Sequence, residues 1–475
     1  MRVCMVLEGC YPYVRGGVSS WTHSLITSNP QHEYVLWLIG AKAEDRGNFK
    51  YEIPKNVVEI HEVFLDDALR LRGSARDRFH FNRQQTAALK ELILCGRPDW
   101  ETLFDLYHTK RVSALSFLMS EDFLKILIEV CEEKYPYISF ADFFHSIRSM
   151  FLPILYLLGQ EAPEADVYHA SSTGYGGVLA ALGAWKYSRP YLLTEHGIYT
   201  REREEEILRA KWIPPRFRQQ WINLFYMLSS CAYERADGVT SLFQRYADIQ
   251  AELGCDPAKQ QVIGNGIRVE RFAAVPDKEP DGYVDIAAVV RIHPIKDIKT
   301  LIQAFFALKQ RMPNVRLHIL GDTDDEEYAE ECRALIRELQ IEDLDMPGNV
   351  DVLAYLARTD FTVLSSISEG QPLAVLESLA AGRPCVTTDV GCCRGLLEGN
   401  EGDDYGPAGI VVPPMHPKAL ANAMELMAAR EEMRREMGEA GRKRVNTYYL
   451  HDDMVQNYNR AYEEVAGRWR ALDLN

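Results

Sequence analysis

The stretch LSSISEGQPLAVLE, residues 364–377, decides the fold of the second half of this chain. The apolar run Phe361–Leu364 predicts a buried strand, a cluster of Ser, Gly and Pro interrupts it, and helical spacing resumes over Leu373–Ala381. Such strand–loop–helix corners lie at the carboxyl ends of parallel strands, where open α/β sheets bind ligands. The unpaired N–H groups at the start of the new helix favour a phosphate or a sugar hydroxyl there.

Two carboxylates belong to this corner. Glu369 lies in the turn, and Glu377 follows about two helical turns later. An acidic residue at a helix start is commonly a cap, so Glu369 alone has a structural interpretation. The neighbouring Gly370 and Pro372 favour a binding loop instead.

Length and composition restrict the class of protein. A chain of 475 residues is too long for one core and predicts two domains. Its 47% hydrophobic and 26% charged residues are ordinary for a globular protein. The formal charge of −16 argues against a nucleic-acid surface, so a few placed Arg and Lys residues must meet any anionic ligand.

The sequence predicts a cytoplasmic protein without a membrane span. No run approaches the roughly 18 consecutive apolar residues of a spanning helix. The first apolar run is too short for a signal peptide and Glu8 interrupts it. The ten cysteines include no CxxC pair, and the adjacent Cys392 and Cys393 lack partners for a metal site. We expect reduced, mostly buried thiols and no metal.

The first half begins with a strand over Arg2–Leu7, followed by a loop that contains Gly16 and Gly17. Ser19 or Ser20 is expected to cap the helix that follows. A two-glycine loop is weak evidence for a nucleotide site by itself, because glycines also end strands for local reasons.

Residues from about 66 to 160 contain little strand signal and predict a helical insertion. The expected helices are Gln84–Leu94, Trp100–Met119 and Glu121–Glu133. We favour a packing role for the insertion over a surface for a polymer acceptor or a partner subunit.

The α/β alternation returns with a strand over Asp166–Ala170, and the strand Tyr191–Thr194 ends in Glu195, His196 and Gly197. A lone His is usually a satisfied core residue. At the carboxyl end of a sheet, beside an acid and before a glycine, His196 becomes a candidate site residue.

Alternating strands and helices predict a doubly wound, parallel sheet in each half. We expect an N-terminal Rossmann-like domain over 1–268, a linker over 269–282, a C-terminal Rossmann-like domain over 283–445, and C-terminal helices over 446–475 that pack back on the first domain.

Arg291 and Lys296 follow the first strand of the second domain, and Pro294 between them favours a turn. Arg offers a planar fork and Lys a point charge, so the two side chains together suit a diphosphate. Surface cations are common, but Arg291, Lys296, Glu369 and Glu377 all follow strand ends of one domain. We therefore expect them to form one site.

These residues resemble the donor-site signature of retaining GT-B glycosyltransferases of family 4. The resemblance rests on Arg291 with Lys296 and on Glu369 and Glu377 in an E-x7-E spacing, and it extends over nearly the whole chain. The segments EGCYPYVRGGVSSW, TEHGIYTRERE, HPIKDIKTLIQAF and SEGQPLAVLES resemble the branch of that family that makes Pel exopolysaccharide. The implied fold is GT-B, with two Rossmann-like domains that face a cleft and a helical insertion in the first.

The resemblance implies a role for each matching residue. Arg291 and Lys296 would hold the diphosphate, Glu377 the ribose hydroxyls, Glu369 the sugar, and His196 the reacting centre. The implied catalytic residues are therefore His196, Glu369, Arg291 and Lys296. The implied substrate-binding residues are Gly16, Gly17, Arg291, Lys296, Gly370, Gln371, Pro372, Leu373 and Glu377.

The implied activity is metal-independent transfer from a UDP-sugar to a growing exopolysaccharide, with no cofactor. From the polysaccharide we expect a UDP-N-acetylhexosamine such as UDP-GalNAc, and recruitment to the inner membrane by export or synthesis proteins. The alternatives are a non-catalytic UDP-sugar-binding assembly or sensor subunit and a nucleotide-sugar epimerase. A front-face displacement is favoured over a covalent intermediate, because no nucleophile stands out.

The chain departs from the family pattern at two positions. Val290 stands where the family usually has Gly before Arg291, and Arg268 stands where it usually has an acid after Asn-Gly-Ile. The first departure affects how closely the backbone approaches a phosphate, and the second affects contacts at the hinge.

Overall fold

The computed structural model describes residues 1–74 and 77–473. The chain divides into two compact units. Unit 1 comprises Met1–Ile263 and Asn457–Asn475, and unit 2 comprises Gly264–Gln456. The C-terminal helix α19 (His451–Asp473) therefore belongs partly to each unit.

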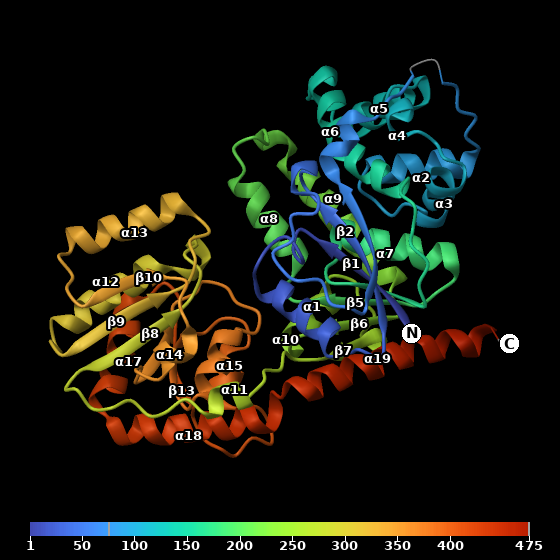
Figure 1. The fold of residues 1–475 in the computed structure, drawn as a ribbon. Helices are drawn as coiled ribbons and strands as arrows, with labels where there is room; N and C mark the ends of the chain where they lie inside the picture. Colours follow the sequence, from blue (N-terminus) through green and yellow to red (C-terminus); the bar gives the residue numbers. More distant parts are fainter. Residues whose placement is uncertain (75–76, 474–475) are drawn as a thin grey trace. The chain divides into compact units, whose positions relative to one another are not determined.

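Unit 1 contains a seven-stranded parallel sheet in the order β3-β2-β1-β4-β5-β6-β7 (Figure 1). Its strands are β1 (Arg2–Glu8), β2 (Glu33–Gly40), β3 (Val57–Phe64), β4 (Val167–Ala170), β5 (Tyr191–Glu195), β6 (Gly238–Ser241) and β7 (Gln260–Val262). The central strands are buried on both faces and contain runs of Val, Leu and Ile, as expected for a parallel sheet covered by helices.

The helices of unit 1 connect these strands. They are α1 (Gly17–Thr27), α2 (Arg83–Ile93), α3 (Trp100–Phe104), α4 (Ala114–Phe117), α5 (Glu121–Lys134), α6 (Phe140–Leu158), α7 (Gly174–Tyr187), α8 (Tyr199–Arg209), α9 (Arg218–Arg235) and α10 (Gln244–Glu252). Short turns of other helix types lie at Ala43–Asp45, Leu65–Arg70, Asp105–Thr109, Pro215–Phe217 and Pro257–Lys259.

The segment between β3 and β4 is helical, and its apolar side chains join the core of unit 1. The expected continuous helix Trp100–Met119 is wrong. The chain forms α3, widens into a π turn over Asp105–Thr109, and leaves the helix before α4. Arg111 has a φ of 55°, a left-handed conformation that ends a helix.

Helix α7 lies close to its neighbours because half of its residues are Gly or Ala. A Cβ on Gly183 would lie 2.3 Å from the ring of Tyr168, and one on Gly177 would lie 2.7 Å from Ala232 on α9. Gly174, at the start of α7, has a φ of 67° and faces the ring of Tyr199. These contacts require glycine, because any side chain would displace an aromatic ring or a packed helix.

Unit 2 contains a six-stranded parallel sheet in the order β10-β9-β8-β11-β12-β13. Its strands are β8 (Val284–Val289), β9 (Val315–Leu320), β10 (Leu344–Gly348), β11 (Phe361–Leu364), β12 (Cys385–Thr388) and β13 (Gly409–Val412). Its helices are α11 (Glu270–Ala273), α12 (Ile298–Lys309), α13 (Glu326–Glu338), α14 (Val352–Leu356), α15 (Leu373–Ala380), α16 (Cys393–Glu398), α17 (Pro417–Ala429) and α18 (Glu431–Tyr448), with a 3-10 turn over Pro294–Lys296.

Both sheets reverse their strand order once, between β1 and β4 in unit 1 and between β8 and β11 in unit 2. Ligands of doubly wound sheets bind at this switch point, outside the carboxyl ends of the strands. The loops that follow β1, β4, β8 and β11 are therefore the places to look for a site. Within the part of the chain that is described, no helix has the length and apolar character needed to cross a bilayer.

Candidate active site

In unit 2 the loops after β8 and β11 meet through one ion pair. Lys296 Nζ donates to Glu369 Oε1 at 2.6 Å, although the two residues are 73 positions apart. Their side chains are only 17% and 9% exposed. Ser366 Oγ also donates to Glu369 Oε1, at 2.5 Å. The structure thus brings two of the predicted site residues together at the switch point of the sheet.

Backbone contacts hold these loops in place. Ile367 N donates to Ile295 O at 2.8 Å, and Ser365 Oγ donates to Lys296 O at 2.8 Å. On the other side, Gly391 has a φ of 57°, and a Cβ there would lie 2.3 Å from the carbonyl oxygens of Glu369 and Gly370. Gly391 therefore allows the loop after β12 to pack directly on the corner.

The corner leaves the first turn of α15 without a side-chain cap. Pro372 occupies the N-cap position of the helix, and the first turn contains no acidic residue. Glu369 is therefore not the cap that its position in the sequence allows, because its carboxylate bonds to Lys296 and Ser366 instead. The uncapped N–H groups and the nearby ammonium make this an anion-binding arrangement.

Gln371 has a structural contact within unit 2. Its Oε1 accepts a hydrogen bond from the backbone N–H of Asn265 at 2.5 Å. This bond fixes the orientation of the side-chain amide of Gln371, so that its NH₂ group does not take part in the contact with Asn265. Asn265 Oδ1 is buried without a hydrogen-bond partner among the described residues.

Arg291 follows β8, five positions before Lys296. Its side chain is half exposed and forms an ion pair with Asp324. Each of the two cations therefore has its own carboxylate partner, Asp324 for Arg291 and Glu369 for Lys296. Asp324 was missed in the sequence, where nothing separates it from its acidic neighbours.

Glu377 lies on α15, partly buried. Burial raises the pKa of its carboxyl to about 7, and the positive charge of Arg271 on α11 partly offsets that effect. The carboxyl therefore changes charge near neutral pH. Arg271 was not singled out by sequence reasoning, because its proximity to α15 depends on how the segment before β8 folds.

In unit 1 the two predicted glycines stand at the start of α1. Gly16 is the N-cap residue, with extended backbone (φ 169°), and the helix begins at Gly17. The expected cap by Ser19 or Ser20 is wrong, because both serines lie inside the first turn and no side chain caps the helix. A Cβ on either glycine would meet no described atom within 4 Å. Neither the backbone conformation nor internal packing therefore demands glycine at these two positions.

His196 follows β5 at the carboxyl edge of the same sheet. Its ring packs edge-on against Trp21 of α1, with 4.3 Å between ring centroids. Burial lowers the pKa of His196 to about 4, so the ring is neutral at pH 7. Its Nε2 is buried and has no hydrogen-bond partner among the described residues. A neutral imidazole with one unsatisfied nitrogen is able to donate to, or accept from, a hydroxyl group.

The neighbouring Glu195 points into the core of unit 1. It accepts hydrogen bonds from Tyr233 at 2.5 Å and from Gln250 at 2.9 Å, and burial raises its pKa to about 7. Its role is structural, because these partners occupy the carboxylate.

Glu8, at the end of β1, is a site candidate that sequence reasoning used only to exclude a signal peptide. It accepts hydrogen bonds from Tyr199 Oη at 2.7 Å and from the N–H of Gly176 at 3.0 Å, and burial raises its pKa. Arg203 lies 3.9 Å from it. The signal that was available is its position at the carboxyl end of the first strand.

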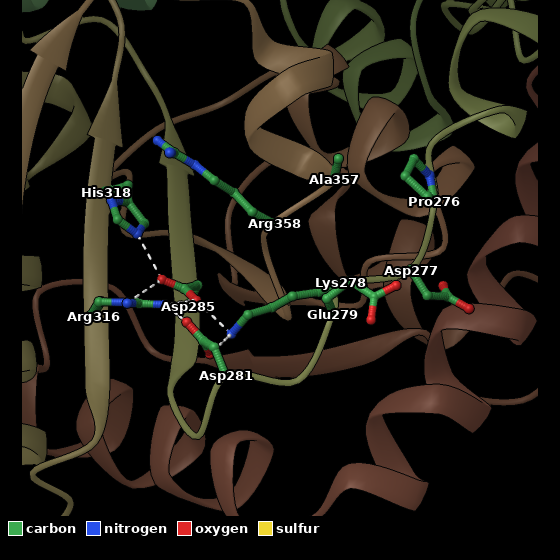
Figure 2. Close-up of a pocket in the computed structure, with 10 residues that line it drawn as sticks. All are labelled: Pro276, Asp277, Lys278, Glu279, Asp281, Asp285, Arg316, His318, Ala357 and Arg358. Carbon is green, nitrogen blue, oxygen red and sulfur yellow. Dashed lines mark hydrogen bonds and ion pairs between the residues drawn. The ribbon is translucent and has the colours of Figure 1, made fainter.

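A pocket of about 470 Å³ lies at the opposite end of the unit 2 sheet (Figure 2). Its walls include Lys278, Asp285, Arg316 and His318, which bond to one another. Asp285 is 4% exposed and receives hydrogen bonds from all three cationic side chains. Because the charges satisfy one another, we assign this cluster to the fold and not to the active site.

Among the described residues, no group of three or more His, Cys, Asp or Glu side chains is arranged to hold a metal ion. The cysteines of the chain are all free in the structure, and burial raises the pKa of several of them, including Cys392 to about 12.

Two family models match the chain. Residues 1–258 match the family model described as "Domain of unknown function (DUF3492)", and residues 271–444 match "Glycosyl transferases group 1". The first match spans more than half of the 475 residues. The second contains the Lys296 and Glu369 corner.

Individual relatives match parts of the chain. WcaL of Escherichia coli K12, a protein named for colanic acid biosynthesis, is 30% identical over 202 residues, which are 40% of this chain and 48% of WcaL. The chain thus matches about half the length of that relative. The MMP alpha-(1->4)-mannosyltransferase of Mycolicibacterium hassiacum is 24% identical over 64% of this chain and 71% of its own.

Solved structures show the same fold. Anabaena HepE in complex with UDP and glucose has a TM-score of 0.59 and 13% identity, over 98% of this chain and 100% of its own. Sucrose-phosphate synthase from Thermosynechococcus elongatus has a TM-score of 0.62 and 16% identity, over 98% of this chain and 99% of its own. The predicted α/β fold of the GT-B class is confirmed.

Proposed function

We propose, on the premise that this chain belongs to the DUF3492 family and contains a glycosyl transferases group 1 domain over residues 271–444, that it is a retaining glycosyltransferase with a UDP-sugar donor. The observation that carries the proposal is the ion pair between Lys296 and Glu369, beside the uncapped N-terminus of α15 at the switch point of the unit 2 sheet. A diphosphate would compete with Glu369 for the ammonium group and free the carboxylate for sugar hydroxyls.

The roles of the unit 2 residues follow from their chemistry. Lys296, Arg291 and the α15 N-terminus, with Gly370, Pro372 and Leu373, surround the diphosphate and stabilise its growing negative charge as it leaves. Glu377 accepts hydrogen bonds from the ribose hydroxyls. Glu369 and the free NH₂ group of Gln371 contact the transferred sugar.

Unit 1 supplies the remaining groups. Gly16 and Gly17 allow the backbone to approach the phosphates, and His196 contacts the sugar at the reacting centre. In the proposed reaction the bond between the anomeric carbon and the diphosphate oxygen breaks, and the acceptor oxygen bonds to the same face of the sugar. The acceptor proton leaves on the diphosphate, so charge and atoms balance without a cofactor or a metal ion.

We further propose a growing exopolysaccharide of the Pel type as the acceptor and a UDP-N-acetylhexosamine, such as UDP-GalNAc, as the donor. Support comes from the sequence segments that resemble the Pel branch, and from relatives named as a colanic acid biosynthesis glycosyltransferase and as an exopolysaccharide phosphotransferase. In this proposal the enzyme works at the cytoplasmic face of the inner membrane, with membrane proteins that export the polymer.

Nucleotide binding tests the donor class. We expect UDP to raise the melting temperature of the protein, and the rise should grow with the ratio of the UDP concentration to its Kd. GDP and ADP should raise it much less. Equal stabilisation by all three would contradict the UDP assignment.

A donor screen with product analysis by NMR tests the reaction and reports sugar, linkage and anomeric outcome together. Retention of configuration is expected. Tight UDP binding without transfer from any donor would favour a sensor or assembly subunit, and interconversion of the free donor would favour an epimerase.

A further inference from the structure

The loop between α8 and α9 exposes a tryptophan among cations. Trp212 is 71% exposed and Leu208 is 52% exposed. Residues 208–218, which we call the Trp212 loop, contain four cationic residues and no acidic residue. These cations are Arg209, Lys211, Arg216 and Arg218. Figure 1 shows α8 and α9, which this loop connects.

The loop is a built structure and not a flexible tail. Ile213 and Phe217 are each 1% exposed and anchor it in the core of unit 1. The indole of Trp212 rests edge-on against Trp221 of α9, with 5.3 Å between ring centroids. Arg218 donates to Ala210 O at 3.3 Å, which ties the two ends of the loop together. Trp212 is therefore held outward while its neighbours are buried.

The positive charge of the loop is partly balanced. Arg209 pairs with Glu205 on α8, and Arg216 pairs with Asp142 on α6 at 2.7 Å. Exposed pairs of this kind are weak and screened by salt. Lys211 is exposed, and no acidic residue among those described lies within ion-pair distance of it or of Arg218. A local positive excess thus remains on a chain whose formal charge is −16.

A second exposed apolar surface lies on α5 and differs from the Trp212 loop in the charge of its surroundings. Leu124 and Ile128, one helical turn apart, are 38% and 40% exposed. The residues around them on α5 are mostly acidic: Glu121, Asp122, Glu129, Glu132 and Glu133. This face repels an anionic surface, whereas the Trp212 loop attracts one.

We propose that the Trp212 loop binds the surface of a lipid bilayer that contains anionic headgroups. An indole prefers the boundary between headgroups and acyl chains, and cations beside it gain attraction from the negative surface potential. One exposed Trp and one exposed Leu are too small for a stable protein interface, but an apolar anchor with adjacent cations suffices for reversible membrane binding. The inference does not depend on the proposed transferase activity.

Vesicle sedimentation of the full chain tests the proposal. We expect binding to vesicles of phosphatidylcholine with phosphatidylglycerol, no binding to phosphatidylcholine alone, and loss of binding at high salt. Trp212→Ser and Lys211→Glu should each weaken the binding about tenfold or more. The matched control Leu124→Ser on α5 should leave it unchanged.

Fluorescence identifies the residue that inserts. Brominated lipids in the anionic vesicles should quench the tryptophan fluorescence of the wild-type protein. The Trp212→Phe variant should lose most of this quenching but retain most of its binding to the vesicles. Melting curves of all variants establish that each is folded.

Three results would overturn the proposal. The first is equal binding to both kinds of vesicle. The second is unchanged vesicle binding by folded Trp212→Ser and Lys211→Glu variants. The third is binding of an acidic peptide to the Trp212 loop at protein concentrations where anionic vesicles do not bind. The last result would assign the loop to an acidic protein partner. Transfer to a free acceptor in solution should be unaffected by Trp212→Ser, which separates this inference from the proposed function.

Discussion

The two ends of the unit 2 sheet each hold a lysine that is paired with a buried carboxylate. At the carboxyl end Lys296 contacts Glu369, and at the amino end Lys278 contacts Asp285. All four side chains are less than a fifth exposed. The lysine–carboxylate pair by itself therefore does not distinguish the carboxyl end of the sheet from the amino end.

The partners around each pair separate them. Lys278 also bonds to Asp360 at 2.9 Å and to the carbonyl of Tyr283 at 2.6 Å, and Asp285 also accepts from Arg316 and His318. The Lys296 pair lies instead beside a helix start without a side-chain cap. A closed network of charges stabilises a fold, whereas a pair beside unsatisfied N–H groups is able to exchange partners with an anionic ligand.

The largest expected effect is a difference in activity between variants of Lys296 and variants of Lys278. Lys296→Met should lower kcat/KM about 10³-fold, because an ammonium placed at a developing charge contributes about 3 to 4 kcal/mol. Lys278→Met should leave kcat/KM per folded molecule nearly unchanged. Steady-state kinetics, with the folded fraction measured by circular dichroism, check both. Similar losses in the two variants would remove the distinction between the ends of the sheet.

The free energy of unfolding should depend more on the amino-end cluster than on the Lys296 and Glu369 pair. Asp285→Ala leaves Lys278, Arg316 and His318 without their shared carboxylate, and should lower the free energy of unfolding of unit 2 by about 3 to 5 kcal/mol. Glu369→Gln keeps a hydrogen-bond acceptor and should cost about 1.5 to 3 kcal/mol or less. Urea unfolding measures both values. A larger cost for Glu369→Gln than for Asp285→Ala would contradict the structural role of the amino-end cluster.

Glu377 gives the carboxyl end a pH dependence. Its pKa of about 7 means that the carboxylate available to ribose hydroxyls increases as pH rises through neutrality. The affinity for UDP should therefore increase about tenfold between pH 6 and pH 8. Calorimetric titration measures it, and Glu377→Gln reports the part that comes from the phosphate of UDP itself. Equal pH dependence in the variant would exclude Glu377 as the titrating group.

His318 gives the amino end a smaller pH dependence. Burial alone would lower its pKa, but its contacts with Asp285 and Asp345 raise it above the value of about 6.5 in an unfolded chain. Its stabilisation is thus complete below the unfolded pKa and is lost as pH rises through the folded pKa.

Urea unfolding should show that the contribution of His318 to the free energy of unfolding declines as pH rises through the folded pKa of its ring. His318→Gln should remove this part of the pH dependence. Asp285 behaves in the opposite sense: its pKa is lowered despite burial, so its contribution is lost as pH falls below the unfolded value of about 3.9. Equal pH dependence of the free energy of unfolding in the wild type and in His318→Gln would show that these contacts do not stabilise the protein.

Much of the fold follows from local pattern. The strand Phe361–Leu364 has in the structure the bounds expected from its apolar run. Strands buried on both faces give unbroken apolar runs, which are easy to recognise. The short exposed strand β7 was not expected, because its residues Gln260–Val262 have no such run.

The helical insertion shows where local pattern fails. Trp100–Met119 has the apolar spacing of a helix, yet the chain leaves the helix between α3 and α4. Packing of Leu106 and Tyr107 in the core of unit 1 decides that break, and periodicity does not report it.

The sequence by itself determined the alternation of strands and helices, the corner at residues 364–377 and the kinds of charged residue that follow the strands. Only the tertiary structure decided which charges meet. Lys296 touches Glu369 because the strand order places β8 beside β11, and Arg291 turns to Asp324 instead. The pKa of Glu377 and the closure of the Asp285 network depend on burial and on partners far away in the chain, and neither quantity is a local property of sequence.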